Sequence, residues 1–364
     1  MKTLNIITAI VLAFQVSQAQ PLKQPAIGGN KKAMVSEDIG ITHVAINYDR
    51  PGVKGREGKI YGQLVHKGYE DLGFGTSKAA PWRAGANENT TIEFSTDVKI
   101  EGKELPAGKY GFFIAYNENE CTIIFSKNNA SWGSYFYDTK EDALRATVKP
   151  VAMDKSVEWL KYEFMNQTEN SATVALMWEK LMIPFKVEVD LFKTQIAEYR
   201  NELRGSKGFT WEAWDQAASL CLQYNTNLEE GLAWANKAVL FEKNFQSLST
   251  AAMLNEKLGK QQKSDSLMKV AMDMGKIMDI HFYGRRLLNQ KRTKEALDVF
   301  KYNAKKNPKN FTTYVGLARG FSANGDYKNA LMNAKAALPL APDDGNKNAV
   351  AGMIKKLEES KDVN

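Results

Sequence analysis

The spacing of hydrophobic residues divides this chain into two parts. Between residues 39 and 190 apolar and polar residues alternate in short runs, which is the period of a β-strand with one buried face. From Leu191 onward apolar residues recur every three or four positions, as they do on one face of an α-helix. The pattern therefore predicts two domains, a strand domain followed by a helical one.

The strand region contains about nine short runs, separated by Gly, Pro, Asn and Asp at the spacing of turns. Parallel pairing of these strands would need crossover helices, and no helical pattern lies between the runs. We expect an antiparallel β-sandwich, with a closed β-barrel as the alternative. The runs cover residues 43–48, 59–65, 91–94, 111–116, 121–126, 144–148, 160–164, 174–178 and 185–189.

The helical region repeats itself with a period of about 34 residues. Small residues recur where paired helices must approach closely, and large ones where space remains to be filled. The pattern is similar to the tetratricopeptide repeat and predicts an α-α solenoid of four units, closed by a helix over residues 346–359. The matching residues of two successive units are Gly284, Ala296, Phe300 and Pro308, then Ala318, Ala330, Ala334 and Pro342.

The start of the chain has the pattern of a cleaved export signal. Lys2 precedes an apolar run from Ile6 to Val16, and small residues follow at the spacing of a signal-peptidase site ending at Ala19. We therefore expect the periplasm or the extracellular space, and no transmembrane segment, because no run reaches about 18 apolar residues. The resulting domain prediction is residues 1–19 for the signal, 20–190 for the β-sandwich, 191–209 for a linker helix and loop, 210–344 for the repeats, and 345–364 for a capping helix and tail.

The distribution of charge, histidine and cysteine narrows the classes of function that the chain can have. The net charge of +7 is spread among acidic residues, and we expect no nucleic-acid partner because a basic face interleaved with aromatic residues is missing. The three histidines are scattered, so neither a metal nor a cofactor is expected. Cys121 and Cys221 are predicted to be two separate buried thiols rather than a disulfide.

Three segments of the strand domain have unusual residues. They are residues 48–56 (YDRPGVKGR), 81–91 (PWRAGANENTT) and 105–110 (LPAGKY). Together they resemble the exported bacterial family called domain of unknown function 2911, over about residues 25–190. A subgroup of that family is similar in carrying tetratricopeptide-like repeats behind this domain. The resemblance implies no activity, because the family has none assigned. A glycine-rich insertion at residues 68–80 departs from the shorter members.

The same segments supply the candidate ligand-binding residues. Arginine guanidinium groups bind carboxylates and phosphates, and a tryptophan ring can stack on a planar ligand or a sugar. The alternative is structural: the arginines pair with Asp49, Glu88 and Asp97 to hold long loops, and the tryptophan fills the core. The candidates for an anionic or glycan ligand are Arg50, Arg56, Trp82, Arg83, Asn87 and Glu88.

The favoured function is that of an exported binding or scaffold protein. Stacked helical repeats normally present a concave surface, so we expect a protein or peptide partner in that groove. The alternative is an envelope enzyme acting on carbohydrate or another anionic substrate, with Glu88 and a second carboxylate in the strand domain. No residue is assigned as catalytic, since no complete catalytic set is visible in the sequence.

Overall fold

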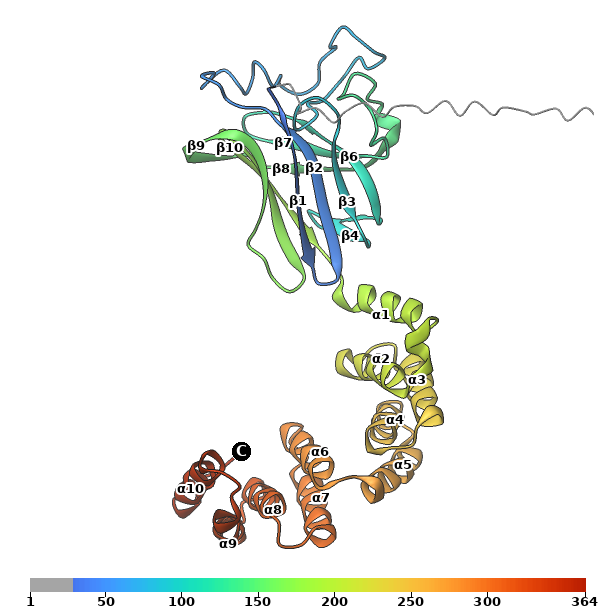
Figure 1. The fold of residues 1–364 in the computed structure, drawn as a ribbon, viewed down its shortest axis with the longest axis vertical. Helices are drawn as coiled ribbons and strands as arrows, with labels where there is room; N and C mark the ends of the chain where they lie inside the picture. The colour runs from blue at the N-terminus through green and yellow to red at the C-terminus, as the bar shows by residue number, and fades with distance from the viewer. Residues whose placement is uncertain (1–28) are drawn as a thin grey trace, which may run out of the picture. The chain divides into compact units, whose positions relative to one another are not determined.

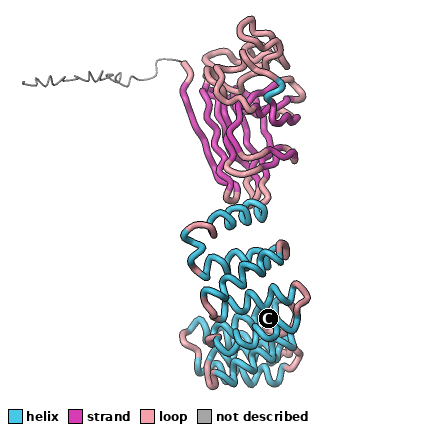
Figure 2. The backbone as a smooth tube through the Cα atoms, turned by 90° about the vertical axis from the view of Figure 1, so that its right-hand side faces the viewer, coloured by secondary structure: helices cyan, strands magenta, loops and turns pink. Residues whose placement is uncertain are grey.

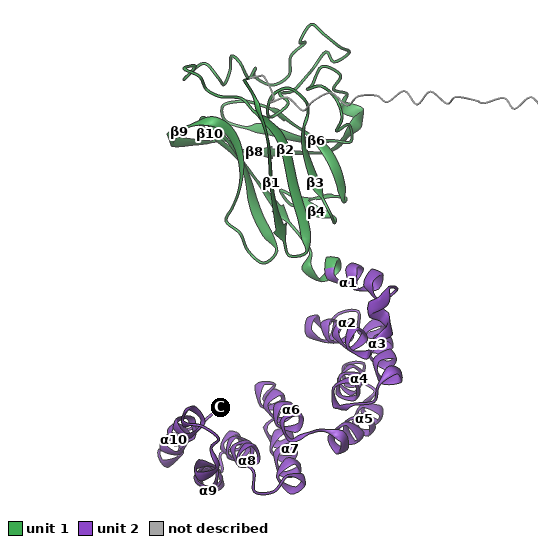
Figure 3. Ribbon diagram, in the orientation of Figure 1, with its two compact units in different colours: residues 1–194 green, residues 195–364 purple. Residues whose placement is uncertain are grey.

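The computed structural model describes residues 29–364, so the predicted export signal lies outside the described residues. The chain divides between Thr194 and Gln195 into two compact units, a strand unit and a helical unit (Figure 3). Each unit has a hydrophobic core of its own. Cys121 is a free, buried thiol in the strand unit, and Cys221 is the same in the helical unit, which confirms the prediction of two separate thiols.

The strand unit contains two antiparallel sheets (Figure 1). The larger has the strand order β1-β2-β3-β6-β7-β8, and the smaller has the order β5-β4-β10-β9. Neither order closes on itself, so the unit is the predicted sandwich and not a barrel. The strands are β1 (Lys31–Ile39), β2 (Thr42–Arg50), β3 (Thr90–Phe94), β4 (Val98–Ile100), β5 (Lys103–Leu105), β6 (Gly108–Ala115), β7 (Cys121–Ser126), β8 (Asp142–Val148), β9 (Val151–Met165) and β10 (Ser171–Glu188).

Aromatic rings join the two sheets in the core of the sandwich. The rings of Phe112 on β6 and Phe185 on β10 lie 5.4 Å apart, and Phe125 on β7 lies 6.0 Å from Phe185. All three side chains are fully buried. Burying an aromatic side chain contributes about 1.5–3 kcal/mol, so this contact between the sheets stabilises the sandwich considerably.

One predicted strand is wrong, and two others are parts of a single strand. Residues 59–65 form a turn: the Gly62 amide donates to the Val65 carbonyl at 2.8 Å, the Val65 amide donates to the Ile60 carbonyl at 2.8 Å, and Gly62 has a φ of 83°. Ile60 and Val65 are buried because they anchor this loop to the core, and that produces a strand-like pattern. Residues 174–178 and 185–189 were expected to be separate strands, but β10 runs through both with an irregularity at Glu179.

Long loops gather at one end of the sandwich (Figure 2). The longest connects β2 to β3 and carries most of the unusual residues named above. It is tied back to the larger sheet through Trp82, which exchanges two main-chain hydrogen bonds with Ile114 on β6. A loop held in this way can present its side chains in fixed positions.

The helical unit continues the chain as consecutive packed helices. After α1 they associate in pairs, α2 with α3, α4 with α5, α6 with α7, and α8 with α9, followed by α10. In Figure 1, α2, α4, α6 and α8 lie on the inner side of the curved unit. The helices are α1 (Leu191–Glu202), α2 (Trp211–Tyr224), α3 (Leu228–Phe241), α4 (Phe245–Lys257), α5 (Gln261–Met274), α6 (Ile277–Asn289), α7 (Thr293–Lys306), α8 (Phe311–Ala323), α9 (Tyr327–Ala337) and α10 (Asp344–Glu358).

The repeat pattern has a direct packing explanation. Phe300 on α7 is 1% exposed and fills the space between α6 and α8. A Cβ atom added at Gly284 would lie 2.5 Å from its ring, and one at Gly316 would lie 2.6 Å away. Only a glycine leaves room for the ring at these two positions. The helical repeat predicted from the sequence is therefore present, with its small residues at the helix contacts.

Candidate functional site

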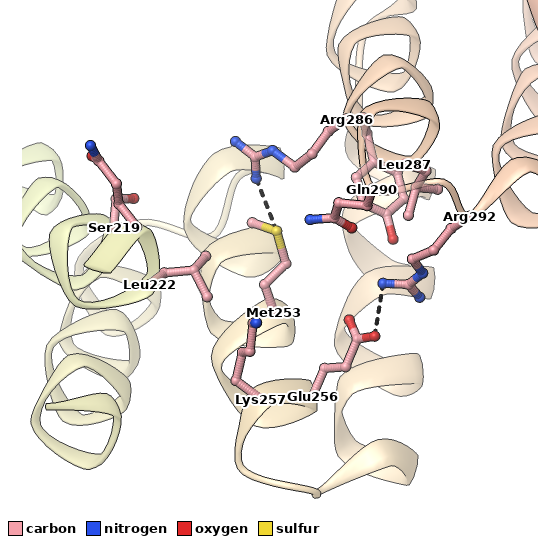
Figure 4. Close-up of a pocket in the computed structure, with 11 residues that line it drawn as sticks. Ser219, Leu222, Met253, Glu256, Lys257, Arg286, Leu287, Gln290 and Arg292 are labelled. Carbon is pink, nitrogen blue, oxygen red and sulfur yellow. Dashed lines mark hydrogen bonds and ion pairs between the residues drawn. The ribbon is translucent and has the colours of Figure 1, made fainter. Parts of the chain in front are cut away.

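A cavity of about 850 Å³ lies among the inner helices of the helical unit, and Figure 4 shows residues that line it. Its walls come from α2, α4, α6 and the turn before α7. Leu222 and Met253 supply apolar surface, while Lys257, Arg286 and Arg292 supply positive charge. Because residues from three successive inner helices line it, the cavity is a product of the repeat stacking rather than of any one unit.

The cations of this cavity differ in their partners. Arg292 is neutralised, since it pairs with Glu256 at 2.8 Å and with Glu295 at 2.6 Å, and these carboxylates raise the pKa of the guanidinium. Arg286 donates from Nη1 to the Met253 sulfur at 2.9 Å (Figure 4). Among the described residues, neither Arg286 nor Lys257 has a carboxylate within 4.0 Å. Within the described part of the chain, Lys257 and Arg286 therefore have no ion-pair partner, although the buried carboxylate of Asp215 on α2 interacts electrostatically with Arg286.

A second cavity of about 230 Å³ lies between α6, α8 and α10. Arg285 and Arg319 line it together with His281, which is 6% exposed. Burial, together with the positive charges of Arg285 and Arg319, lowers the pKa of His281 to about 4. Burial also lowers the pKa of Arg319. Arg285 and Arg286 are adjacent on α6, so positive charge lines both cavities on this side of the unit.

In the strand unit, the three candidate arginines bond to main-chain carbonyl groups. Arg50 Nε donates to Leu160 at 2.8 Å, Arg56 donates to Val53 at 3.0 Å and to Gly52 at 2.7 Å, and Arg83 Nη1 donates to Asn87 at 2.5 Å. The expectation that carboxylates would pair with these arginines is therefore wrong. Carbonyl oxygens satisfy some of the N–H donors but leave each guanidinium with its full charge.

Trp82 fills the core, as the structural alternative expected. It is 8% exposed, and its indole Nε1 donates to the Gly85 carbonyl at 3.1 Å. Its ring stacks with Trp178 at a centroid distance of 6.2 Å and an interplanar angle of 22°. The same side chain nevertheless lines a cavity of about 350 Å³ at the loop end of the unit, together with Arg56 and Arg83.

Asn87 and Glu88 take part in a different cluster. Glu88 Oε1 accepts from Lys32 Nζ at 3.0 Å, which lowers the pKa of Glu88. Asn87 Nδ2 donates to Asp49 at 3.2 Å, and Asn87 Oδ1 accepts from Asn30 at 3.2 Å. Burial raises the pKa of Asp49, and Glu88 raises it as well, while the bond from Asn87 opposes the change. This cluster joins β1, β2 and the loop before β3.

The structure thus brings together only part of the predicted ligand set. Arg56, Trp82 and Arg83 share the 350 Å³ cavity, whereas Arg50, Asn87 and Glu88 are not among its lining residues. Among the further lining residues that sequence reasoning missed are His66, Tyr135 and Trp178. Trp178 lies on β10, far from the unusual segments, and no local pattern indicated it.

Across residues 29–364 no group of three or more His, Cys, Asp or Glu residues is arranged to hold a metal ion. None of the helices in that range combines the length and the apolar character needed to cross a membrane.

The strand unit has a recognisable family. Residues 30–187 match the family described as "Protein of unknown function (DUF2911)". A comparison with curated proteins gave no match.

The helical unit is similar to solved repeat structures. MamA from Desulfovibrio magneticus is 18% identical, with a TM-score of 0.26 over 43% of this chain and 96% of that chain. YrrB, "a TPR protein with an unusual peptide-binding site", is 15% identical, with a TM-score of 0.28 over 44% and 84%. A tetratricopeptide repeat protein from Parabacteroides merdae is 14% identical, with a TM-score of 0.30 over 47% and 70%. The chain therefore combines a domain that matches the DUF2911 family with a following array of tetratricopeptide-like helical repeats.

Proposed function

We propose that the helical unit binds a protein partner through an acidic segment that lies in the 850 Å³ cavity of α2, α4 and α6. The observation that carries the proposal is the charge of that cavity. Lys257 and Arg286 project from successive inner helices, and neither has a carboxylate within 4.0 Å among the described residues. A carboxylate from the partner would form the ion pair that these two cations lack.

The size and lining of the cavity suit a side chain together with part of a backbone. Its volume falls within the range of about 300–1,000 Å³ that is typical of ligand sites. Leu222, Met253 and Leu287 offer apolar contact beside the two cations. Apolar contact supplies affinity, while the charged groups fix orientation and raise the association rate. The partner segment that fits best is therefore amphipathic, with acidic and apolar residues in close succession.

The proposed location follows from the sequence alone. We propose that the chain is exported and that this binding takes place outside the cytoplasm, with the strand unit as an accompanying domain of unassigned activity. Fractionation of producing cells, combined with mass determination of the mature N-terminus, tests the location. Recovery in the envelope or medium with cleavage after Ala19 supports it, and an uncleaved cytoplasmic protein contradicts it.

Binding is tested with the full chain and arrays of short synthetic peptides that vary in net charge and apolar content. We expect acidic amphipathic peptides to be retained and their lysine-substituted counterparts to be rejected. Arg286→Ala should weaken the retained peptides by roughly tenfold or more, because a hydrogen bond between charged groups contributes about 1.5–3 kcal/mol. Lys269→Ala is the matched control, since it removes one exposed cation from the outer helix α5.

Retention that is independent of peptide charge would contradict the proposal. So would equal weakening by Arg286→Ala and Lys269→Ala, because that result would indicate only long-range attraction to a basic protein. The enzyme alternative stays a prediction. Its key residue, Glu88, pairs with Lys32 and does not line the cavity beside Trp82.

A further inference from the structure

The cavity of about 350 Å³ in the strand unit has an unusual composition. It lies among the long loops, with walls from the loop between β2 and β3, from Ser134 and Tyr135, and from β10. Its lining includes two arginines and one histidine, and none of the described residues that line it is Asp or Glu. A cavity with cations and without carboxylates attracts an anion from solution.

The two arginines keep donors available. A guanidinium group carries five N–H donors. The structure records two side-chain bonds for Arg56, both to main-chain carbonyls, and one for Arg83, to the Asn87 carbonyl. Both side chains are partly buried, so water compensates their charge less well than at the surface. An anion in the cavity would accept from the remaining N–H groups.

The rest of the wall is aromatic and apolar. Trp82 and Trp178 stack on each other, and the Arg83 guanidinium lies 5.1 Å from the centroid of the Tyr135 ring. Leu64 and Leu72 complete the apolar side. A bare inorganic ion would leave this surface exposed to water, whereas a ring attached to the anionic group would cover it.

Two buried polar atoms on the cavity wall lack hydrogen-bond partners. Trp178 is 1% exposed, and its indole Nε1 makes no hydrogen bond in the described structure. His66 Nδ1 is also buried without a hydrogen bond, with Glu70 as its nearest recorded charge at 4.0 Å. Buried polar groups are normally hydrogen-bonded, and an unsatisfied group that lines a cavity is therefore a sign of a missing ligand.

The loop geometry holds Arg83 in its position. Gly133 has a φ of 67°, and a Cβ atom added there would lie 2.0 Å from the Arg83 guanidinium carbon. Ala84 and Asn87, on either side of Gly85, have positive φ values of 49° and 55°. The left-handed conformation is strained for alanine, whereas asparagine adopts it readily. The structure thus keeps a strained backbone conformation at Ala84, next to Arg83.

We propose that this cavity binds a small organic anion, in which a carboxylate or phosphate group contacts Arg56 and Arg83 and a single ring-sized apolar body lies against the aromatic wall. The volume is near the lower end of the range for small-molecule sites, which favours a compact ligand. Carboxylates and phosphates share recognition by guanidinium forks, so the test distinguishes the two.

The test is ligand-observed NMR and calorimetry on the full chain with four probes of similar size: benzoate, phenyl phosphate, benzyl alcohol and benzylamine. We expect at least one of the two anions to bind at least about tenfold more tightly than the neutral alcohol, and the cation to be excluded. Preference for benzoate identifies a carboxylate site, and preference for phenyl phosphate identifies a phosphate site.

Substitutions then test whether the ligand binds in this cavity. Arg83→Gln should reduce affinity for the preferred anion by roughly tenfold or more, and Arg83→Lys should restore part of it. Gly133→Ala should also weaken binding, because it displaces the guanidinium without removing its charge. Lys59→Gln is the matched control, since it removes an exposed cation from the same loop but does not line the cavity.

Several results would overturn the proposal. One is equal binding of benzoate, phenyl phosphate and benzyl alcohol by the unsubstituted protein, which requires no folded variant to interpret. Another is the absence of any anion binding at concentrations up to about 10 mM. Equal losses for Arg83→Gln and Lys59→Gln, with both variants folded by circular dichroism, would also reject it.

Discussion

At the scale of single residues, burial and charge together decide how His281 behaves. This side chain is 6% exposed and faces Arg285 and Arg319, and burial is the larger of the influences that lower its pKa to about 4. An unfolded histidine has a pKa of about 6.5. The unfolded chain therefore takes up a proton first as the pH falls, and the folded helical unit loses stability between about pH 6.5 and pH 4.

This difference gives a pH-dependent prediction. Between pH 7 and pH 5, His281 should contribute a loss of about 2 kcal/mol to the free energy of unfolding. The measurement is urea unfolding of the parent chain and of His281→Gln at both pH values, followed by helix circular dichroism. The variant should lose less stability on acidification than the parent does. Equal losses would show that His281 is not protected from protonation.

The candidate site was only partly predictable at this scale. Arg56, Trp82 and Arg83 stand out because rare residue types cluster in one loop, and the structure places all three around one cavity. His66 and Trp178 reach the same cavity from an ordinary loop position and from β10. Their contribution depends on long-range packing of the sandwich, which leaves no local pattern in the sequence.

At the scale of elements, glycine positions in the helices report how closely neighbouring helices pack. Gly284 on α6 faces the ring of Phe300, whereas Gly352 on α10 is exposed and has no neighbouring heavy atom within 4 Å of an added Cβ. Alanine is a better helix former than glycine by about 1 kcal/mol in both places. Packing against the Phe300 ring should therefore make alanine destabilising at position 284, although alanine should be stabilising at position 352.

We expect Gly352→Ala to stabilise the helical unit by about 0.5–1 kcal/mol. Gly284→Ala should destabilise it by about 1–3 kcal/mol, because the added methyl group overlaps the Phe300 ring. Denaturant unfolding of the two variants beside the parent measures both effects. Stabilisation by Gly284→Ala would show that α6 and α7 do not pack as described.

The helices and strands were predictable where their apolar residues lie on one buried face. The helix pairs recur with a period of about 34 residues, and small residues recur where their helices contact each other. The false strand at residues 59–65 arose because Ile60 and Val65 anchor a turn to the core, and anchoring residues at such spacing imitate an alternating strand. The continuity of β10 through Glu179 depends on its pairing with β9, which the sequence alone does not reveal.

At the scale of the whole molecule, the described part of the chain carries cations without ion-pair partners in two separate units. In the helical unit they are Lys257 and Arg286, and in the strand unit they are Arg56 and Arg83. The overall charge of +7 is modest, so these sites are local concentrations rather than parts of a uniformly basic surface. We propose an acidic protein segment as the ligand of the helical unit and a small organic anion as the ligand of the strand unit.

Charge reversal at the inner helices tests the central claim most directly. Peptide affinities are measured by fluorescence anisotropy for the full parent chain and for a Lys257→Glu, Arg286→Glu double variant, with a Lys263→Glu, Lys269→Glu variant on α5 as the charge-matched control. If the cavity of α2, α4 and α6 is the docking site, the double variant should lose acidic peptides and prefer their lysine-substituted counterparts, while the control keeps the parent's preference. An unchanged preference in the double variant, or the same change in the control, would contradict the assignment.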